Sequence, residues 1–359
     1  MKKWLNGSAY TGRLPKGCVH CARGGKLVLL VTGKCNSGCY YCPLSFKKKG
    51  RDVVYADEMK VGKDANILEE AGLIEATGTG ITGGDPFIQP KETARLIRLI
   101  KDSFGEKHHI HLYTSSTDRR AIEKVASAGL DEIRFHPPAS EWSRLDKSEY
   151  SGAIVLSRSL GMDAGFEIPA IPGCEKDVRT FLCDAYDVGA SFVNLNELEF
   201  SESNWRALRK RGFDVKDDVS ASVRGSERMA LGLLRDAPEG LSTHYCSSSF
   251  KDGIQLRRRI MRRAVNVARP LDVLTKDGTL IMGIIETKRP DALAIELGRL
   301  FGIPKKYLSP NREMRRVELA SWILEEIADD LDQEAFIIEE YPTADRLEVE
   351  RETIGPRRR

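Results

Sequence analysis

The chain has 359 residues, of which 41% are hydrophobic and 30% are charged, and its formal net charge is +3. These values exclude an intrinsically disordered chain, and the length is enough for one large core with smaller modules. The first ten residues, MKKWLNGSAY, lack the apolar run of a signal peptide, and no stretch has the length of a membrane span. We therefore expect a cytoplasmic protein without a membrane partner, whose eight cysteines are thiols or metal ligands and not a disulfide framework.

Residues 26–205 alternate short apolar runs with amphipathic stretches. The predicted strands are KLVLLVTG from Lys26, GTGITGGD from Gly78, HIHLYTSS from His109, LDEIRFHP from Leu130, GFEIPAIPG from Gly165 and SFVNLNELEF from Ser191. The helical patterns between them end on glycine, which is typical of a left-handed helix cap. This rhythm predicts an α/β fold, with six βα units that form a partial (βα)6 parallel barrel.

The later strands each have one polar face. A parallel strand that is covered on both sides should be apolar throughout, so these faces need another explanation. They either line a cavity for a charged ligand inside the barrel or hydrogen-bond one another. The polar residues are His109, His111, Tyr113, Arg134, His136, Glu167, Asn194 and Asn196.

The rest of the chain predicts three further segments. Residues 1–25 form an N-terminal extension with a Cys-x2-Cys knuckle, which precedes the core at residues 26–205. Residues 206–263 are basic and are expected to be helical. Residues 264–359 are expected to form a small mixed α+β module, with a hairpin at Asp277-Gly278, a helical region centred on 311–331, and strands near 334–341 and 346–352.

Cys35, Cys39 and Cys42 lie within eight residues, directly after the first predicted strand of the core. Thiolates bind soft metals, and three of them can hold three corners of an iron–sulfur cluster. A structural zinc site normally closes with four ligands, usually as two separated pairs. The missing fourth ligand therefore indicates a cluster with one iron open to a small molecule.

The stretch CNSGCYYC resembles the signature of the radical S-adenosylmethionine (SAM) superfamily. The resemblance implies that the three cysteines hold a [4Fe–4S] cluster and that SAM ligates its unique iron. It implies reductive cleavage of SAM, with electrons from a ferredoxin- or flavodoxin-type donor, to a 5′-deoxyadenosyl radical that removes a hydrogen atom from the substrate. Tyr41 is similar to the aromatic residue that lines the adenine.

Further motifs follow in the order that this resemblance implies. Residues Gly83, Gly84, Asp85 and Pro86 resemble the Gly-Gly-Glu-Pro motif that holds the amino group of SAM, with a shorter carboxylate here. Thr114 and Ser115 are expected at the ribose. The stretch from Ile168 to Gly173 resembles the Ile-Pro-Gly segment of glycyl-radical activating enzymes, which leads into a helix under the adenine. The whole chain resembles an archaeal group of radical enzymes related to pyruvate formate-lyase activating enzyme.

Other polar residues of the barrel are candidates for ligand contacts. Glu167, Asn194 and Asn196 are candidates for the ribose or the substrate, and His111, Arg134 and His136 for the substrate. We name no general acid or base, because the cofactor abstracts the hydrogen and the protein mainly positions it.

A second metal site is predicted from Cys18 and Cys21 together with Cys246 and His244. One Cys-x2-Cys pair cannot close a site, so the distant pair would complete a zinc site or an auxiliary iron–sulfur cluster. A tight turn with two small apolar thiols, or a redox pair, is the alternative.

The sequence leaves the substrate open. A small metabolite or cofactor precursor in the polar barrel is the favoured interpretation. Basic runs at 47–51, 206–211, 257–263 and 312–316 fit a tRNA substrate, although solvated helix faces explain them too. A protein or peptide partner, recognised by the C-terminal module and its last two strands, is the third interpretation. A non-catalytic metal-binding scaffold is the alternative to an enzyme.

Overall fold

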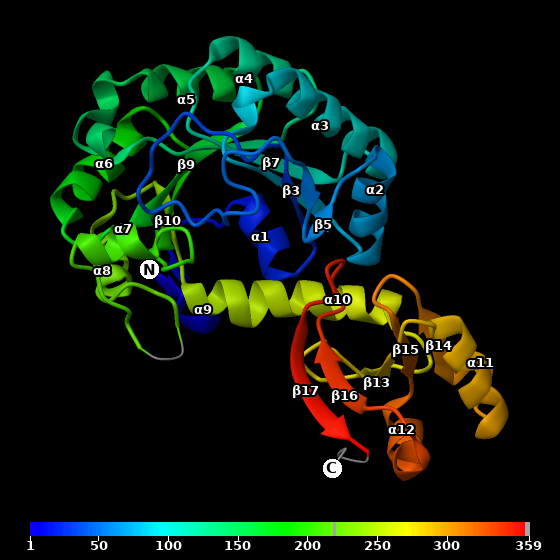
Figure 1. Cartoon of the computed structure of the whole chain (residues 1–359). Helices are drawn as coiled ribbons and strands as arrows, with labels where there is room; N and C mark the ends of the chain where they lie inside the picture. Colours follow the sequence, from blue (N-terminus) through cyan, green and yellow to red (C-terminus); the bar gives the residue numbers. More distant parts are fainter. Residues whose placement is uncertain (218–219, 356–359) are drawn as a thin grey trace. The chain divides into compact units, whose positions relative to one another are not determined.

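A sheet with parallel strands at its centre forms the first of two units into which the computed structural model divides (Figure 1). The structure describes residues 1–217 and 220–355, and the first unit holds Met1–Gly72 and Ala76–Leu256. In spatial order the described strands are β1 (Lys2–Lys3), β2 (Ala9–Tyr10), β11 (Ser242–Cys246), β10 (Phe192–Glu197), β9 (Asp163–Ala170), β8 (Glu132–Phe135), β7 (His109–Thr114), β6 (Gly78–Thr82), β3 (Lys26–Leu30), β4 (Tyr55–Ala56) and β5 (Met59–Lys60). Strands β11 to β3 in this order are parallel, and the outer pairs are antiparallel. The expected α/β fold with a parallel sheet is confirmed.

Helices follow the parallel strands and lie along the outer side of the sheet, where Figure 1 shows α2 to α6 in one arc. Each buries an apolar stripe, such as Leu96, Ile97 and Ile100 of α3. The predicted helix-ending glycines, at 105, 129, 161 and 189, all have positive φ. The helices of this unit are α1 (Lys16–Ala22), α2 (Asp64–Leu73), α3 (Pro90–Phe104), α4 (Arg119–Ala126), α5 (Glu149–Ser159), α6 (Glu175–Asp187), α7 (Trp205–Lys210), α8 (Ser226–Asp236) and α9 (Ser248–Phe250).

Helix α1 lies on the inner side of the sheet, against β3, β6 and β7 (Figure 1). A Cβ on Gly17 would come within 2.6 Å of Arg134 Nη2 and 2.8 Å of His111 Nδ1, so only glycine permits this approach. The backbone N–H of Gly17 donates to Glu132 Oε2 at 3.1 Å. The N-terminal segment is therefore part of the barrel interior and of the sheet edge, and not a separate extension.

The prediction that residues 206–263 are helical is wrong at Ser242–Cys246, which form β11. This strand pairs in parallel with β10 and antiparallel with β2. Its sequence, STHYC, has no apolar run and follows a basic region, so periodicity gives no strand signal. The pairing with two buried neighbours, and not intrinsic propensity, explains the strand.

The second unit holds Leu73–Glu75 and the chain from Arg257 onward. Its described sheet has the order β14-β15-β13-β16-β17, with β12 paired to β13. The predicted hairpin at Asp277-Gly278 and the last two strands are confirmed, whereas the helical region expected over 311–331 is a strand pair followed by a short helix. The elements are α10 (Arg257–Val267), β12 (Val273–Leu274), β13 (Leu280–Glu286), α11 (Pro290–Leu300), β14 (Leu308–Asn311), β15 (Arg316–Leu319), α12 (Ser321–Ile327), β16 (Ala335–Glu340) and β17 (Glu348–Ile354).

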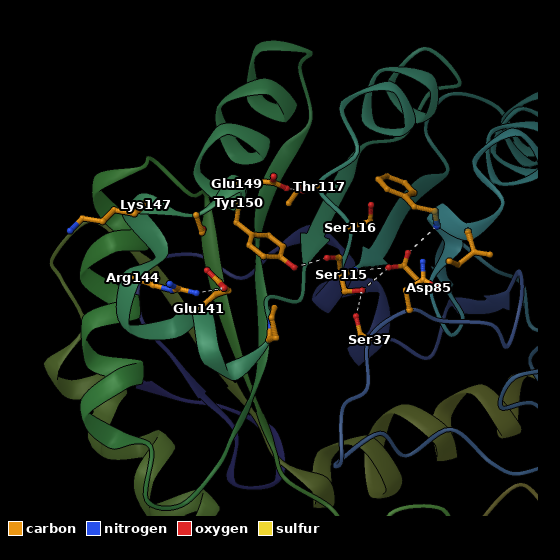
Figure 2. Close-up of a pocket in the computed structure, with 15 residues that line it drawn as sticks. Ser37, Asp85, Ser115, Ser116, Thr117, Glu141, Arg144, Lys147, Glu149 and Tyr150 are labelled. Atoms are coloured by element: carbon orange, nitrogen blue, oxygen red, sulfur yellow. Dashed lines mark hydrogen bonds and ion pairs between the residues drawn. The ribbon is translucent and has the colours of Figure 1, made fainter.

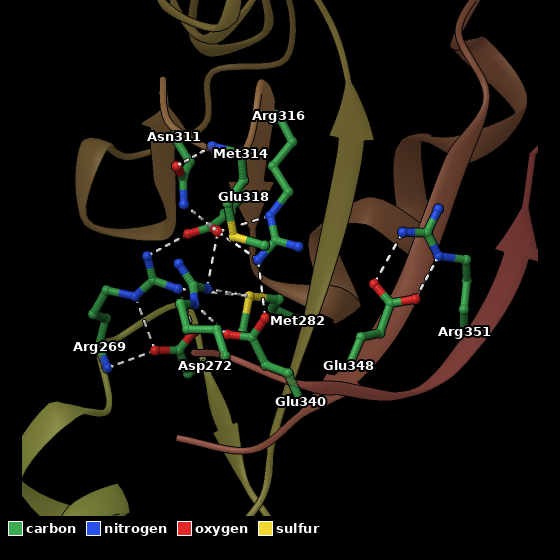
Figure 3. Close-up of polar contacts among 11 residues, drawn as sticks. Arg269, Asp272, Met282, Asn311, Met314, Arg316, Glu318, Glu340, Glu348 and Arg351 are labelled. Carbon is green, nitrogen blue, oxygen red and sulfur yellow. Dashed lines mark hydrogen bonds and ion pairs between the residues drawn. The ribbon is translucent and has the colours of Figure 1, made fainter. Parts of the chain in front are cut away.

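A buried ion network crosses the sheet of the second unit (Figure 3). The guanidinium of Arg316 lies 2.8 Å from Glu318 and 2.9 Å from Glu340, and all three residues are almost fully buried. Arg269 and Arg346 also contact the Glu318 carboxylate, at 2.5 and 2.9 Å. Burial alone would raise the pKa of Glu318, but the arginines, Arg269 first, hold that pKa at about 2.

Replacement of Glu318 tests this network. We expect Glu318→Gln to reduce the stability of the second unit by about 3 kcal/mol, because buried guanidinium groups lose their counter-charge. Hydrogen exchange of the β13, β15 and β16 amides measures the loss, with the exposed Glu313→Gln as the matched control. Equal exchange in the two variants would show that the network contributes no stability.

Candidate active site at the ends of the parallel strands

A cavity of about 820 Å³ lies at the carboxyl ends of the parallel strands. Its lining comes from the loops after β3 and β6 and from the ends of β7, β8, β9 and β10. Cys35, Cys39 and Cys42 line this cavity, Cys35 exposed and the other two half-buried. Carboxyl ends of parallel strands are where α/β proteins bind ligands, because the loops there converge from several strands.

Hydrogen bonds from two sides hold the backbone of the loop that carries the cysteines. Gly84 N donates to Thr32 O at 2.6 Å, and Asp85 N donates to Lys34 O at 2.8 Å. On the other side Asn204, just before α7, donates to Tyr41 O at 3.0 Å. The loop is therefore positioned by the structure around it before any ligand binds.

Gly83 and Gly84 are required by this packing. A Cβ on Gly84 would lie 2.1 Å from Lys34 O, and one on Gly83 would lie 2.5 Å from Thr32 O. The glycines are needed because the loop after β6 lies directly on the backbone of the cysteine loop.

Both carboxylate oxygens of Asp85 accept hydrogen bonds from the protein itself (Figure 2). Its Oδ1 accepts from Phe87 N at 2.9 Å and from Thr114 Oγ1 at 2.7 Å. Its Oδ2 accepts from the backbone N and the hydroxyl of Ser115, at 3.0 and 2.7 Å. Asp85 lines a neighbouring cavity of about 680 Å³, whereas Gly83 and Gly84 line the larger one. The buried carboxylate thus ties the end of β6 to the end of β7, and contact with the amino group of SAM stays a prediction.

Ser37 and Ser115 line both cavities and are joined by a hydrogen bond of 2.7 Å. Figure 2 shows this bond next to the contacts of Ser115 with Asp85 and of Tyr150 with Ser115. The predicted ribose residues Thr114 and Ser115 both line the larger cavity. Their hydroxyls donate to Asp85, so each has only acceptor capacity left for a ligand.

Tyr41, His136 and the backbone of Glu167 form a chain of hydrogen bonds at the cavity wall. Tyr41 Oη lies 2.9 Å from His136 Nε2, and His136 Nδ1 lies 2.7 Å from Glu167 O. A carbonyl can only accept, so His136 Nδ1 carries the proton and Nε2 accepts from the tyrosine hydroxyl. Burial lowers the pKa of His136 and so favours the neutral ring.

Charged and amide groups form a polar layer below the cavity. Arg134 Nη1 lies 2.6 Å from Glu167 Oε2, and its Nε lies 2.6 Å from Glu132 Oε1. Asn194 and Asn196 donate to Glu167 at 2.9 and 2.8 Å. Burial alone would raise the pKa of Glu167, but Arg134 and the two amides hold it at about 2. Glu167 and Asn196 therefore line the cavity, and Arg134, Glu167, Asn194 and Asn196 hydrogen-bond one another.

The structure separates some predicted residues from the cavity. Ile168 alternates with Glu167 and Pro169, which line the cavity, so its buried side chain points to the opposite face of β9. Its side chain does not line the cavity, and its predicted cofactor contact stays a prediction. His111 lies under α1 instead, and Pro86 begins a short 3-10 helix at Pro86–Ile88.

The residues of the predicted second metal site, Cys18, Cys21, Cys246 and His244, all line one cavity of about 180 Å³. In the described part of the chain, no three His, Cys, Asp or Glu side chains surround a point as ligands of a single ion. That criterion does not apply to a cluster, whose ligand sulfurs surround a larger inorganic core. The second site stays a prediction.

The residues of the large cavity fit a [4Fe–4S] cluster with SAM. Three thiol side chains on one prepositioned loop provide three cluster ligands, and the cavity beside them has room for a small molecule. A family model described as the radical SAM superfamily matches residues 29–141. A second, described as a domain of unknown function (DUF8061), matches residues 278–354.

A protein of Methanocaldococcus jannaschii, provisionally named a glycyl-radical enzyme activating enzyme, is 41% identical over 352 residues. The match covers 94% of this chain and 92% of that protein. The chain thus belongs to the radical SAM superfamily: it is an enzyme of a family that uses a [4Fe–4S] cluster and SAM. These similarities give no support to the favoured small-metabolite substrate.

Two solved structures are similar to parts of this chain. Methylornithine synthase is 15% identical with a TM-score of 0.41, and the match covers 59% of this chain and 62% of that one. The native enzyme anSMEcpe, with bound AdoMet and a peptide, is 14% identical with a TM-score of 0.36, over 47% and 50% of the two chains.

Among the described residues, no helix is both long and apolar enough to cross a membrane.

Gly84→Ala tests the packing of the cysteine loop. We expect this variant to incorporate less iron and sulfide and to cleave SAM about 100-fold more slowly, because the added methyl displaces the loop. The control is Gly72→Ala on α2, where a Cβ meets nothing within 4 Å. Normal iron content and cleavage in Gly84→Ala would contradict the packing argument.

Proposed function

We propose that this enzyme activates a partner protein by generating a glycyl radical on it. The observation that carries the proposal is the 41% identity to the M. jannaschii protein, because it extends over 94% of this chain and 92% of that one. The likeness thus includes the second unit as well as the radical SAM core. We infer that the second unit recognises the partner.

The position of the cysteine loop supports a macromolecular substrate. Cys35 is exposed, and Lys34 beside it keeps 48% of its side chain exposed. A small metabolite is usually enclosed, which excludes water from the reaction. A glycine on a loop of a partner protein would itself cover such an exposed edge.

The polar layer also supports a macromolecular substrate and not a small charged metabolite. Arg134, Glu167, Asn194 and Asn196 are hydrogen-bonded to one another, so their charges and amides are largely satisfied within the protein. The basic run at 312–316 that favoured tRNA includes Arg316, which is buried against Glu318 and Glu340. That arginine is not part of a phosphate-binding surface.

Cys35, Cys39 and Cys42 would hold the cluster at the cavity that Tyr41, Gly83 and Gly84 also line. The cluster and SAM, when bound and reduced by one electron, would supply the radical chemistry that removes a hydrogen atom from glycine. In a hydrogen-atom transfer the proton and the electron move together, so no side chain has to act as an acid or a base. The neutral His136 and the anionic Glu167 therefore serve to orient ligands. A ferredoxin- or flavodoxin-type donor in the cytoplasm would supply the electron.

Deuterium transfer tests the proposal. The reconstituted enzyme is incubated anaerobically with reductant, SAM and extract from source cells grown on [2,2-²H₂]glycine. We expect deuterium in 5′-deoxyadenosine by mass spectrometry, with loss of the signal after protease treatment and not after ribonuclease or removal of small molecules. Cys39→Ala is the negative control.

Two outcomes of this experiment contradict the proposal. Transfer that survives protease but is lost with the small-molecule fraction would identify a metabolite as the hydrogen donor. Transfer that depends on RNA would identify a nucleic acid.

A further inference from the structure

Two pairs of potential metal ligands face one cavity inside the barrel. Cys18 and Cys21 are three residues apart on α1 and so lie on one helix face. His244 and Cys246 are two residues apart on β11 and so lie on one strand face. All four line the cavity of about 180 Å³, and Cys18, Cys21 and His244 are at most 9% exposed.

His244 indicates that this cavity holds a ligand. Its side chain is buried, and neither ring nitrogen has a hydrogen-bond partner among the described residues. A buried polar group left without a partner costs about 1–3 kcal/mol, so native structures seldom contain one unless an ion or water completes it. The Trp4 ring packs edge-on against the imidazole, with 5.4 Å between ring centroids, and helps to fix its orientation.

The surroundings of Cys18 are those of a metal-bound sulfur. Arg134 Nη2 and Asn194 Nδ2 both donate to Cys18 Sγ, each at 3.5 Å. Lys26 and Lys251 also line the cavity. Arg134 is paired with Glu132 and Glu167, and Lys251 with Glu199, so Lys26 adds positive charge beside these ion pairs. Hydrogen bonds to sulfur and nearby positive charge stabilise anionic thiolate clusters.

We propose that Cys18, Cys21, Cys246 and His244 hold a second, auxiliary iron–sulfur cluster. The cavity of about 180 Å³ is larger than a single zinc ion needs. A cluster places its ligands around a larger inorganic core. Lys26, Tyr113, Glu167, Asn196 and Lys251 line both this cavity and the large one, so the second cluster lies one layer of side chains from the radical site. This inference does not depend on the identity of the hydrogen donor.

Metal analysis of a chain without the radical cluster tests the proposal. The variant Cys35→Ala/Cys39→Ala/Cys42→Ala is reconstituted anaerobically, and its iron, sulfide and zinc are measured. We expect it to keep about half of the iron and sulfide of the unmodified protein, because one of two clusters remains. Adding Cys18→Ser and Cys246→Ser should remove the rest. Adding Cys183→Ser, at an exposed thiol, is the matched control and should remove none.

A second variant separates ligand loss from misfolding. In the triple-alanine background, His244→Cys should keep iron and sulfide, and the reduction potential of the remaining cluster should fall, because a thiolate replaces a neutral imidazole. The proposal is overturned if the triple variant holds no iron and sulfide, or holds zinc without sulfide. It is also overturned if Cys18→Ser and Cys246→Ser leave the metal content unchanged.

Discussion

The active site depends on the contact between two stretches of backbone, the loop after β6 and the loop that carries the cysteines. Gly83 and Gly84 come so close to Thr32 and Lys34 that no Cβ fits between them. Asp85, the next residue, then fixes the end of β7 through Thr114 and Ser115. One short motif thereby sets the relative positions of three strand ends, and these strand ends supply most of the cavity. Catalysis that relies on positioning needs such a rigid support, because small displacements of reacting groups are costly.

The interior of the barrel is polar because a helix with cysteines and a charged layer occupy it. Arg134 lies between Glu132 and Glu167 and reaches the sulfur of Cys18. Burial of an arginine costs free energy unless its N–H groups have acceptors and its charge has counter-charges. Here two carboxylates balance the charge, and the ring of Tyr113 and the sulfur of Cys18 provide further contacts. The polar faces of β7 to β10 thus lie between the large cavity and the cavity of about 180 Å³ that Cys18 lines.

The core strands were predictable because each has an apolar run or one apolar face of strand length, bounded by turn residues. Strand β11 was not, since STHYC gives no such run and its pairing with β10 is a tertiary effect. The cysteine loop was predictable from the spacing of its thiols together with its resemblance to the family signature. The hydrogen bonds of Asp85 within the protein were not predictable. A sequence does not show that Thr114 and Ser115, about 30 residues later, donate to both of its carboxylate oxygens. The side chain of Ile168 could have been assigned to the other face from the sequence, since side chains alternate along a strand and Glu167 precedes it. In the second unit, the basic run at 312–316 suggested surface charge, whereas Arg316 is buried in an ion network that only the fold brings together.

The most direct test of the account is reductive cleavage of SAM by the anaerobically reconstituted enzyme with dithionite. The readout is 5′-deoxyadenosine by mass spectrometry, compared with Cys39→Ala. The account predicts that the unmodified enzyme forms 5′-deoxyadenosine and that the variant forms none. A protein that binds iron and sulfide at Cys35, Cys39 and Cys42, yet leaves SAM intact even with cell extract added, would contradict it.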